Sequence, residues 1–206
     1  YAAIGATDHE IKGSTGQDWF YSGSGISRLV GGDGSDTYLF SKGHGQDVIY
    51  DYGYSSATET DTLIFTNVKS SEVKFGRRGD DLILFGYHGS DQITIEKFFT
   101  YTSYSYAIEV FQFSDKAITY DDLVAKGLSL SALSDNDVIT GWNGINLIET
   151  TTGNHTINTN GADDIIHLGS GNHIVNTGSG NDTIFSGSGN NVLEGGMGSD
   201  TYVFSK

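Results

Sequence analysis

A nine-residue period constrains the fold of this chain more than any other feature. In blocks of nine from residue 132 to residue 203, the eighth place is always apolar: Ile139, Ile148, Ile157, Ile166, Val175, Ile184, Leu193 and Tyr202. This spacing is too sparse for an amphipathic helix or an ordinary alternating strand. It predicts a solenoid, in which a strand of about three residues places one side chain inward and a glycine-rich turn then reverses the chain.

Two further patterns support the solenoid. The sixth place of the same blocks is polar (Asp137, Asn146, His155, Asp164, His173, Asp182, Asn191 and Asp200), and glycine recurs at the second and fourth places, especially from residue 168 onward. Blocks from residue 4 to residue 39 follow the same rule, with Ile11, Phe20, Leu29 and Tyr38 at place eight and His9, Asp18, Ser27 and Asp36 at place six. Residues 31–42 and 195–206 are identical at 10 of 12 positions. We therefore expect a fragment of a tandem array.

The nine-residue period disappears between about residue 51 and residue 130, where conventional strand signals replace it. Strands are expected at 63–65, 73–75, 82–85, 92–95 and 108–113, and one short helix between Thr119 and Gly127. Aromatic side chains gather between these strands: Phe98, Phe99, Tyr101, Tyr104 and Tyr106. They are interpreted as packing against or capping the ends of the rolls, with a carbohydrate-binding or peptide-binding face as the alternative. The predicted parts are 1–50, 51–130 and 131–206.

Composition narrows the classes of function. The chain has 26 acidic and 11 basic residues, a formal net charge of -15, 29 glycines and neither proline nor cysteine. Like charges repel, so the net charge disfavours nucleic acid and anionic membrane surfaces as partners of this segment and favours cations. Disulfides and cysteine-based zinc sites are also excluded. No run of 18 apolar residues is present, and neither H-E-x-x-H nor G-x-S-x-G occurs, so neither membrane insertion nor catalysis is expected.

Residues 31–39 and 195–203 both fit G-G-x-G-x-D-x-U-x, so the chain resembles the RTX (hemolysin-type) calcium-binding repeat proteins. The segment from Asp61 through Gly79-Asp80 to Asp115 is similar to a repeat-associated domain of large iron-regulated RTX proteins. The resemblance implies an all-β chain: two parallel β-rolls flanking a small, mainly antiparallel capping domain with one helix. It also implies that two nonapeptides form one turn, so that loops on one edge recur every 18 residues.

The resemblance further implies calcium (Ca2+) between successive loops of one edge. The first loop offers the carbonyls of places two and four, the next those of places one and three, and each adds its place-six carboxylate. The implied sites are Asp164 and Asp182 with carbonyls of Asn160, Ala162, Thr177 and Ser179; Asp182 and Asp200 with Gly178, Gly180, Gly195 and Met197; and Asp18 and Asp36 with Ser14, Gly16, Gly31 and Asp33.

Other positions depart from the motif. A site between Asn146 and Asp164 is expected to be weaker, and Asp47 could restore one on the edge that holds His9 and Ser27. The edge of Asp137, His155, His173 and Asn191 is expected to be mostly empty. Its two histidines are interpreted as hydrogen-bonding substitutes for aspartate, with transition-metal binding as the alternative.

The expected function is a calcium-binding module of a type I secreted protein, folding on extracellular calcium. The alternatives are an adhesin spacer or ligand-binding module, or the non-catalytic repeat region of a cytotoxin or secreted hydrolase. We expect a monomer, secreted or on the bacterial surface, whose parent protein could supply a host-surface or carbohydrate ligand. The secretion signal is expected beyond residue 206.

Overall fold

A computed structural model describes residues 2–5, 9–53, 59–100 and 108–204. The chain divides into two compact units. The N-terminal unit comprises residues 1–74 and 80–121, and the C-terminal unit comprises residues 75–79 and 122–206. The described chain is all-β, with one α-helix and one turn of 3-10 helix, η1 (Ser70–Glu72). This confirms the predicted fold class of a parallel β-solenoid.

The N-terminal unit consists of two sheets. The order of the first is β1 (Ala2–Gly5), β3 (Trp19–Ser22), β5 (Thr37–Phe40), β7 (Thr62–Phe65), β11 (Val110–Gln112) and β12 (Ala117–Thr119). The order of the second is β2 (His9–Lys12), β4 (Ser27–Val30), β6 (Gln46–Tyr50), β10 (Gln92–Ile95) and β9 (Asp81–Phe85). Consecutive strands from β1 to β7 therefore alternate between the two sheets, so each turn of the roll contributes one strand to each sheet.

Stacked apolar side chains explain why these strands align. Phe20 pairs with Tyr38, Tyr38 with Leu63 and Leu63 with Phe111, and all four are buried. Each of these side chains points inward from its short strand, so parallel stacking buries a continuous apolar column.

The segment between the repeats contributes to this roll. It contains antiparallel pairs, β9 with β10 and β11 with β12, but β7, β10 and β11 also pair in parallel with other strands of the sheets. Residues such as Leu63 and Ile95 occupy the same inward register as the repeat residues Tyr38 and Ile49. The predicted division of the chain at residues 50 and 130 stays a prediction.

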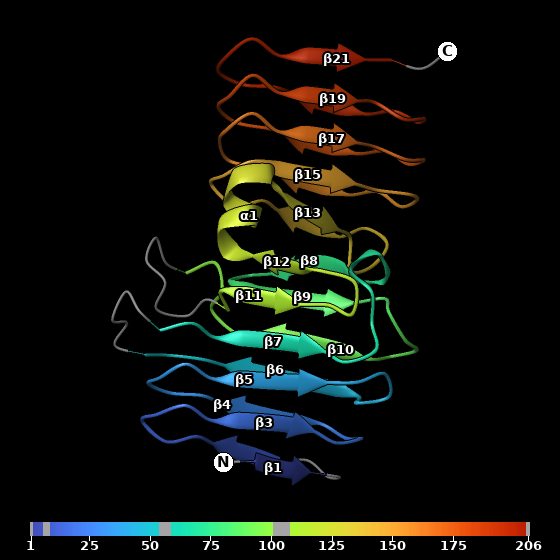
Figure 1. Cartoon of the computed structure of the whole chain (residues 1–206). Coiled ribbons are helices and arrows are strands. Elements are labelled where there is room, and N and C mark those ends of the chain that lie inside the picture. Colours follow the sequence, from blue (N-terminus) through green and yellow to red (C-terminus); the bar gives the residue numbers. More distant parts are fainter. Residues whose placement is uncertain (1, 6–8, 54–58, 101–107, 205–206) are drawn as a thin grey trace. The chain divides into compact units, whose positions relative to one another are not determined.

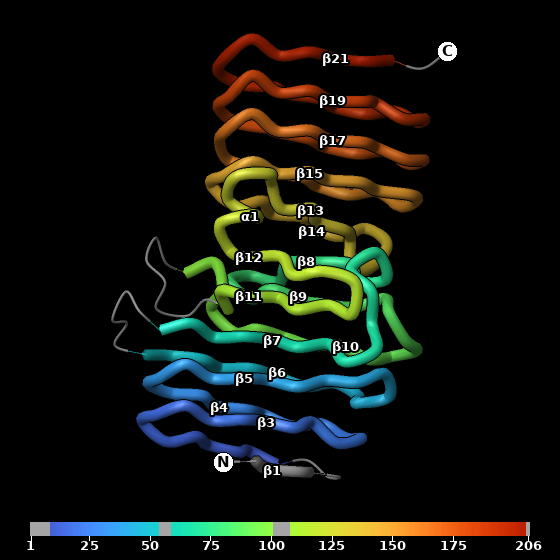
Figure 2. Tube along the Cα trace, viewed as in Figure 1, coloured from blue at the N-terminus to red at the C-terminus, as the bar shows by residue number. Residues whose placement is uncertain are grey.

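The C-terminal unit repeats every 18 residues. One sheet contains β8 (Lys74–Arg78), β13 (Leu128–Ser131), β15 (Asn146–Glu149), β17 (Ile165–His167), β19 (Thr183–Phe185) and β21 (Thr201–Val203). The other contains β14 (Val138–Thr140), β16 (Thr156–Asn158), β18 (Ile174–Asn176) and β20 (Val192–Glu194). Figure 1 shows β15, β17, β19 and β21 stacked in order, and Figure 2 traces the loops that join them to the opposite sheet.

The register of this unit confirms the nine-residue analysis. Ile148, Ile166, Ile184 and Tyr202 are aligned across one sheet. The other sheet aligns Ile139, Ile157, Val175 and Leu193. From Ile139 to Ile184 these side chains are buried, so one bulky side chain per nonapeptide fills the interior there, whereas Leu193 is half-buried and Tyr202 is exposed.

The predicted helix is α1 (Tyr120–Lys126). Leu123 is its buried residue, and the helix ends at Gly127, whose φ of +93° favours glycine and whose N–H donates to the Leu123 carbonyl at 3.0 Å. Among the described residues no helix is long and apolar enough to cross a membrane. Of the predicted aromatic cluster, Phe98 packs against Phe99 and Phe111, whereas Tyr101, Tyr104 and Tyr106 lie outside the described residues.

Candidate metal sites

The place-six side chains form a hydrogen-bonded ladder along each edge of the C-terminal unit. On the edge formed by Asn146, Asp164, Asp182 and Asp200, here termed the carboxylate edge, each carboxylate accepts the backbone N–H of the residue one turn earlier. The N–H of Asn146 donates to Asp164 Oδ1 at 2.7 Å, that of Asp164 to Asp182 Oδ1 at 2.8 Å, and that of Asp182 to Asp200 Oδ1 at 3.1 Å. The 18-residue repeat therefore places these carboxylates in successive turns.

The second carboxylate oxygen distinguishes the predicted sites. Asp164 Oδ2, Asp182 Oδ2 and Asp36 Oδ2 are buried and have no hydrogen-bond partner. Buried polar atoms without a partner are rare and costly, and an unpaired buried charge costs more. Burial raises the pKa of Asp164 to about 6, and the neighbouring Asp182 charge adds to the rise. A bound cation would supply the missing partner, so these residues fit calcium.

Backbone conformation brings the loop carbonyls to the same edge. Gly178, Gly180, Gly196 and Gly198 all have positive φ, and a Cβ on Gly180 would lie 2.0 Å from the Ala162 carbonyl oxygen. Only glycine permits this approach of one loop to the next. The predicted carbonyl ligands of this unit lie in three successive loops of one edge. Asn160 and Ala162 precede β17; Thr177, Gly178, Ser179 and Gly180 precede β19; and Gly195 and Met197 precede β21. Their role as ligands stays a prediction.

The loop before β17 adopts this conformation without glycine at places two and four. Asn160 has a φ of 73° and Ala162 a φ of 71°. Asparagine tolerates this region, but alanine is strained in it by about 1–2 kcal/mol. The stacking of loops in this unit therefore outweighs the local preference of the backbone.

The N-terminal unit has a similar ladder. The N–H of Asp18 donates to Asp36 Oδ1 at 2.9 Å, and a Cβ on Gly34 would lie 2.7 Å from the Gly16 carbonyl oxygen. The loop of Ser14 and Gly16 therefore stacks on the loop of Gly31 and Asp33. Asp18 differs from Asp36, because its Oδ2 accepts the N–H and hydroxyl of Ser14, and the backbone bond lowers its pKa.

The ladder continues into residues that sequence reasoning missed. The N–H of Asp36 donates to Asp61 Oδ1 at 2.8 Å, and the N–H of Asp61 donates to Glu109 Oε2 at 2.6 Å. Burial raises the pKa of Asp36 and of Glu109 to about 7. The signal was present in the sequence, because Asp61 precedes Leu63 by two residues as Asp36 precedes Tyr38.

Asp47 is the predicted ligand with the least support. Its Oδ1 accepts the N–H of Ser27 at 2.9 Å, and its Oδ2 accepts the Ser22 hydroxyl at 2.7 Å. The Oδ2 atom also lies 2.6 Å from His44 Nδ1, whose ring continues to the Tyr87 hydroxyl through Nε2 at 2.7 Å. Both oxygens of Asp47 thus have protein partners, and the buried imidazole of His44 is one of them.

The opposite edge of the C-terminal unit, here termed the histidine edge, consists of Asp137, His155, His173 and Asn191. The N–H of Asp137 donates to His155 Nδ1, that of His155 to His173 Nδ1, and that of His173 to Asn191 Oδ1, at 3.1, 3.3 and 2.8 Å. The two rings stack with centroids 5.4 Å apart.

These bonds fix the chemistry of the two imidazoles. Each Nδ1 accepts a hydrogen bond, so each neutral ring carries its hydrogen on Nε2. His155 Nε2 donates to the Thr152 carbonyl at 2.8 Å, while His173 Nε2 is buried without a partner. Burial lowers the pKa of His173, and the His155 ring contributes. The free lone pairs that a transition metal needs are therefore used by the backbone, which favours the interpretation as hydrogen-bonding substitutes.

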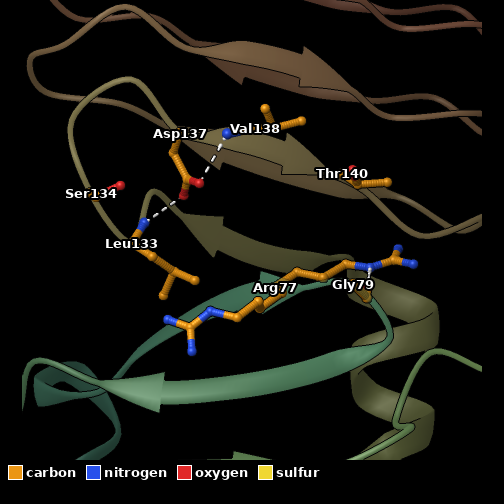
Figure 3. Close-up of a pocket in the computed structure, with 8 residues that line it drawn as sticks. Arg77, Gly79, Leu133, Ser134, Asp137, Val138 and Thr140 are labelled. Atoms are coloured by element: carbon orange, nitrogen blue, oxygen red, sulfur yellow. Dashed lines mark hydrogen bonds between the residues drawn. The ribbon is translucent and has the colours of Figure 1, made fainter.

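A pocket of about 250 Å³ lies in the C-terminal unit and is lined by Arg77, Arg78, Gly79, Leu133, Ser134, Asp137, Val138 and Thr140. Figure 3 shows that Asp137 accepts the N–H groups of Leu133 and Val138, at 2.8 and 2.9 Å, and that Arg77 donates to the Gly79 carbonyl. Its lining includes no histidine or cysteine. The polar groups of this pocket therefore stabilise its own loops.

The fold and the ladders define a class: a parallel β-solenoid of calcium-binding repeats. Residues 12–46, 143–172 and 174–202 match the RTX calcium-binding nonapeptide repeat, and residues 81–117 match the haemolysin-type calcium binding protein related domain. Together these matches cover more than half of the chain, and the chain belongs to the RTX calcium-binding repeat proteins.

One similar protein is the iron-regulated protein FrpA of Neisseria meningitidis serogroup C. It is 34% identical over 64 residues, which is 31% of this chain and 6% of that protein. The chain thus spans a small part of this relative. The comparisons and the fold confirm the predicted resemblance and the predicted ion, calcium.

Proposed function

We propose that this chain is a non-catalytic module of a type I secreted bacterial protein, and that it folds when it meets extracellular calcium. The observation that supports the proposal is the set of buried carboxylate oxygens without partners at Asp36, Asp164 and Asp182. These atoms lie on edges whose loops stack too closely for any residue larger than glycine at several positions. Calcium accepts six to eight oxygen ligands, so it can join a carboxylate to the carbonyls of two loops.

The free energy of ion binding would then contribute directly to folding. In the absence of a cation, the net charge of -15 and the buried carboxylates oppose the compact state. Extracellular modules bind calcium with dissociation constants of about 10⁻⁴ to 10⁻³ M. Cytosolic calcium lies far below this range. The chain would therefore stay unfolded for export through a narrow channel and fold outside the cell.

A calcium titration followed by far-UV circular dichroism tests this function. Chelator-treated protein should gain β signal cooperatively with calcium but not with magnesium, which prefers rigid octahedral sites with several waters. Asp182→Asn should shift the transition to higher calcium. A chelated chain that is already fully folded, and that does not respond to calcium, would contradict the proposal.

A second candidate function is that of a spacer in a surface adhesin. The recurrence of residues 31–42 at 195–206 favours it, because tandem rolls can hold another domain away from the cell. A host-surface or carbohydrate ligand would then be bound by another part of the parent protein, and this module would be monomeric. The spacer role predicts that calcium raises the force needed to unfold the chain in single-molecule pulling. An unfolding force that does not depend on calcium would contradict it.

A further inference from the structure

Three aspartates come together in the N-terminal unit, and only Asp36 among them belongs to a predicted calcium pair. Asp36, Asp51 and Asp61 each offer a carboxylate oxygen, and these oxygens all lie within 4.8 Å of one another. Asp36 and Asp51 are buried and Asp61 is half-buried. Asp51 and Asp61 lie outside the segments that match the repeat or its related domain, which end at residue 46 and resume at residue 81. Neither comparison therefore assigns these residues a role.

Each carboxylate is fixed by one of its two oxygens. Asp36 Oδ1 accepts the N–H of Asp18, Asp61 Oδ1 accepts the N–H of Asp36, and Asp51 Oδ2 accepts the Tyr38 hydroxyl at 2.8 Å. Anchoring of this kind holds the side chains in place and leaves the second oxygen of Asp36 without a protein partner, while Asp51 and Asp61 also share a side-chain hydrogen bond.

The remaining oxygen of Asp36 shows that a partner is required. Asp36 Oδ2 is buried and has no hydrogen bond. A Cβ built on Gly31 would lie 2.4 Å from this atom and 2.8 Å from Asp51 Oδ1. Both oxygens, together with the Tyr38 hydroxyl at 2.2 Å from the same Cβ position, therefore border the space beside the Gly31 backbone. An unpaired carboxylate oxygen directed into a group of further carboxylates is the arrangement that a bound cation stabilises.

The surrounding charges do not neutralise the cluster. Among the described residues, the ion pairs of Arg28 and Lys42 involve Glu10, Glu96 and Glu72, and none includes the three aspartates. Glu109 adds a further acidic group through its bond with the N–H of Asp61. The donors on offer are oxygens, which favour calcium over the transition metals that prefer nitrogen or sulfur.

We infer that Asp36, Asp51 and Asp61 form an additional calcium site of the N-terminal unit. The ion would join the repeat loop that contains Gly31 to the chain just after β6 and to the chain just before β7. Calcium would thereby stabilise the point at which the nonapeptide repeats pass into the intervening segment, in addition to the repeat loops themselves.

Calcium titration by isothermal calorimetry on the whole chain tests this site with two variants. Asp51→Asn keeps an acceptor for the Tyr38 hydroxyl, and Asp61→Asn keeps one for the Asp36 N–H, so both should fold. Each should bind one calcium fewer than the unaltered chain, or bind one calcium at least about tenfold more weakly. The matched control is Asp135→Asn, which removes one exposed charge in the other unit and should change neither value.

Circular dichroism in calcium verifies that the variants are folded, and if one is not, the other decides. The inference is overturned if folded Asp51→Asn and Asp61→Asn bind calcium as the control does, since the cluster would then hold a proton in place of an ion. The outcome is separate from that of the proposed function. If only Asp182→Asn loses calcium binding, the site of Asp36, Asp51 and Asp61 is overturned and the proposed function stands. If calcium binding is unchanged in all three variants, both the site and the proposed function are overturned.

Discussion

Asp182 is shared by two of the predicted calcium sites, so its replacement should have a large and specific effect. Asp182→Asn keeps an oxygen that can accept the Asp164 N–H, as Asn191 does for His173 on the histidine edge. The ladder should therefore persist while the charge and the oxygen without a partner are removed. The variant separates the hydrogen-bonding role of the side chain from its role as a ligand.

The expected magnitude follows from mass action. At about 10 mM calcium, a site with a dissociation constant of about 10⁻⁴ to 10⁻³ M stabilises the folded state by about 1.4–2.7 kcal/mol. Asp182→Asn weakens the sites with both Asp164 and Asp200, so the C-terminal unit should lose about 3–5 kcal/mol of calcium-dependent stability if both are lost. In chelator the effect of Asp182→Asn on the stability of the C-terminal unit should have the opposite sign. The variant should then fold at least as well as the unaltered chain, because the buried charge next to Asp164 is gone.

The assay should report on the C-terminal unit alone. Trp142 lies in this unit, with its indole N–H bonded to the Ile145 carbonyl at 2.8 Å, and the other tryptophan, Trp19, is exposed. In a Trp19→Phe background, urea unfolding followed by fluorescence therefore measures the stability of the C-terminal unit. His173→Asn is the matched control, since it replaces a ladder acceptor on the histidine edge and should leave the calcium dependence unchanged.

The reasoning is refuted if Asp182→Asn retains the full calcium-dependent stabilisation. It is also refuted if His173→Asn loses as much of that stabilisation as Asp182→Asn, because the two edges would then be equivalent. A variant that is unfolded even at saturating calcium would show that asparagine cannot maintain the ladder at this position.

The other predictions concern the loops and pH. Ala162→Gly should stabilise the C-terminal unit by about 0.5–1 kcal/mol in urea unfolding, since relief of strain at a φ of 71° exceeds the added entropy of the unfolded chain, and a loss of stability would contradict this. Gly180→Ala should cost at least about 2 kcal/mol in the same assay, because its Cβ would lie 2.0 Å from the Ala162 carbonyl oxygen, and an unchanged midpoint would contradict it. Burial raises the pKa of Asp36 to about 7 and that of Asp51 to about 9, so the folded chain without calcium binds these protons more tightly than the unfolded chain. Folding in chelator should therefore improve as pH falls from about 9 towards the ordinary aspartate pKa of 3.8, with Asp51 contributing from about pH 9 and Asp36 from about pH 7. A β signal that decreases as pH falls from about 9 to about 5 would contradict these raised pKa values.

The repeat architecture could be predicted from the sequence because a single inward position defines it. Isoleucines at place eight, such as Ile148, Ile166 and Ile184, specify the 18-residue register that the structure confirms. The unequal edges could also be predicted, since Asp182 and His173 occupy the same place on opposite edges.

The sequence did not reveal how the intervening segment joins the roll. Asp61 precedes Leu63 as Asp36 precedes Tyr38, but it lies 25 residues after Asp36, a separation that the 18-residue repeat does not specify. Asp51 is not in a repeat loop, and only the tertiary contact with Tyr38 places it beside Asp36. Side-chain partners were equally hidden, because His44 saturates Asp47 through a contact that no spacing rule specifies. Local periodicity specifies the register of a solenoid, but the hydrogen-bond partners of each carboxylate depend on its neighbours in space.

A crystal structure determined in calcium, with an anomalous difference map to locate the ions, tests the central claim most directly. The account predicts peaks between Asp164 and Asp182, between Asp182 and Asp200, and beside Asp36, with no peak at His155 or His173. Calcium along the histidine edge, or its absence beside Asp164 and Asp182, would contradict the claim that buried carboxylate oxygens without partners mark the sites.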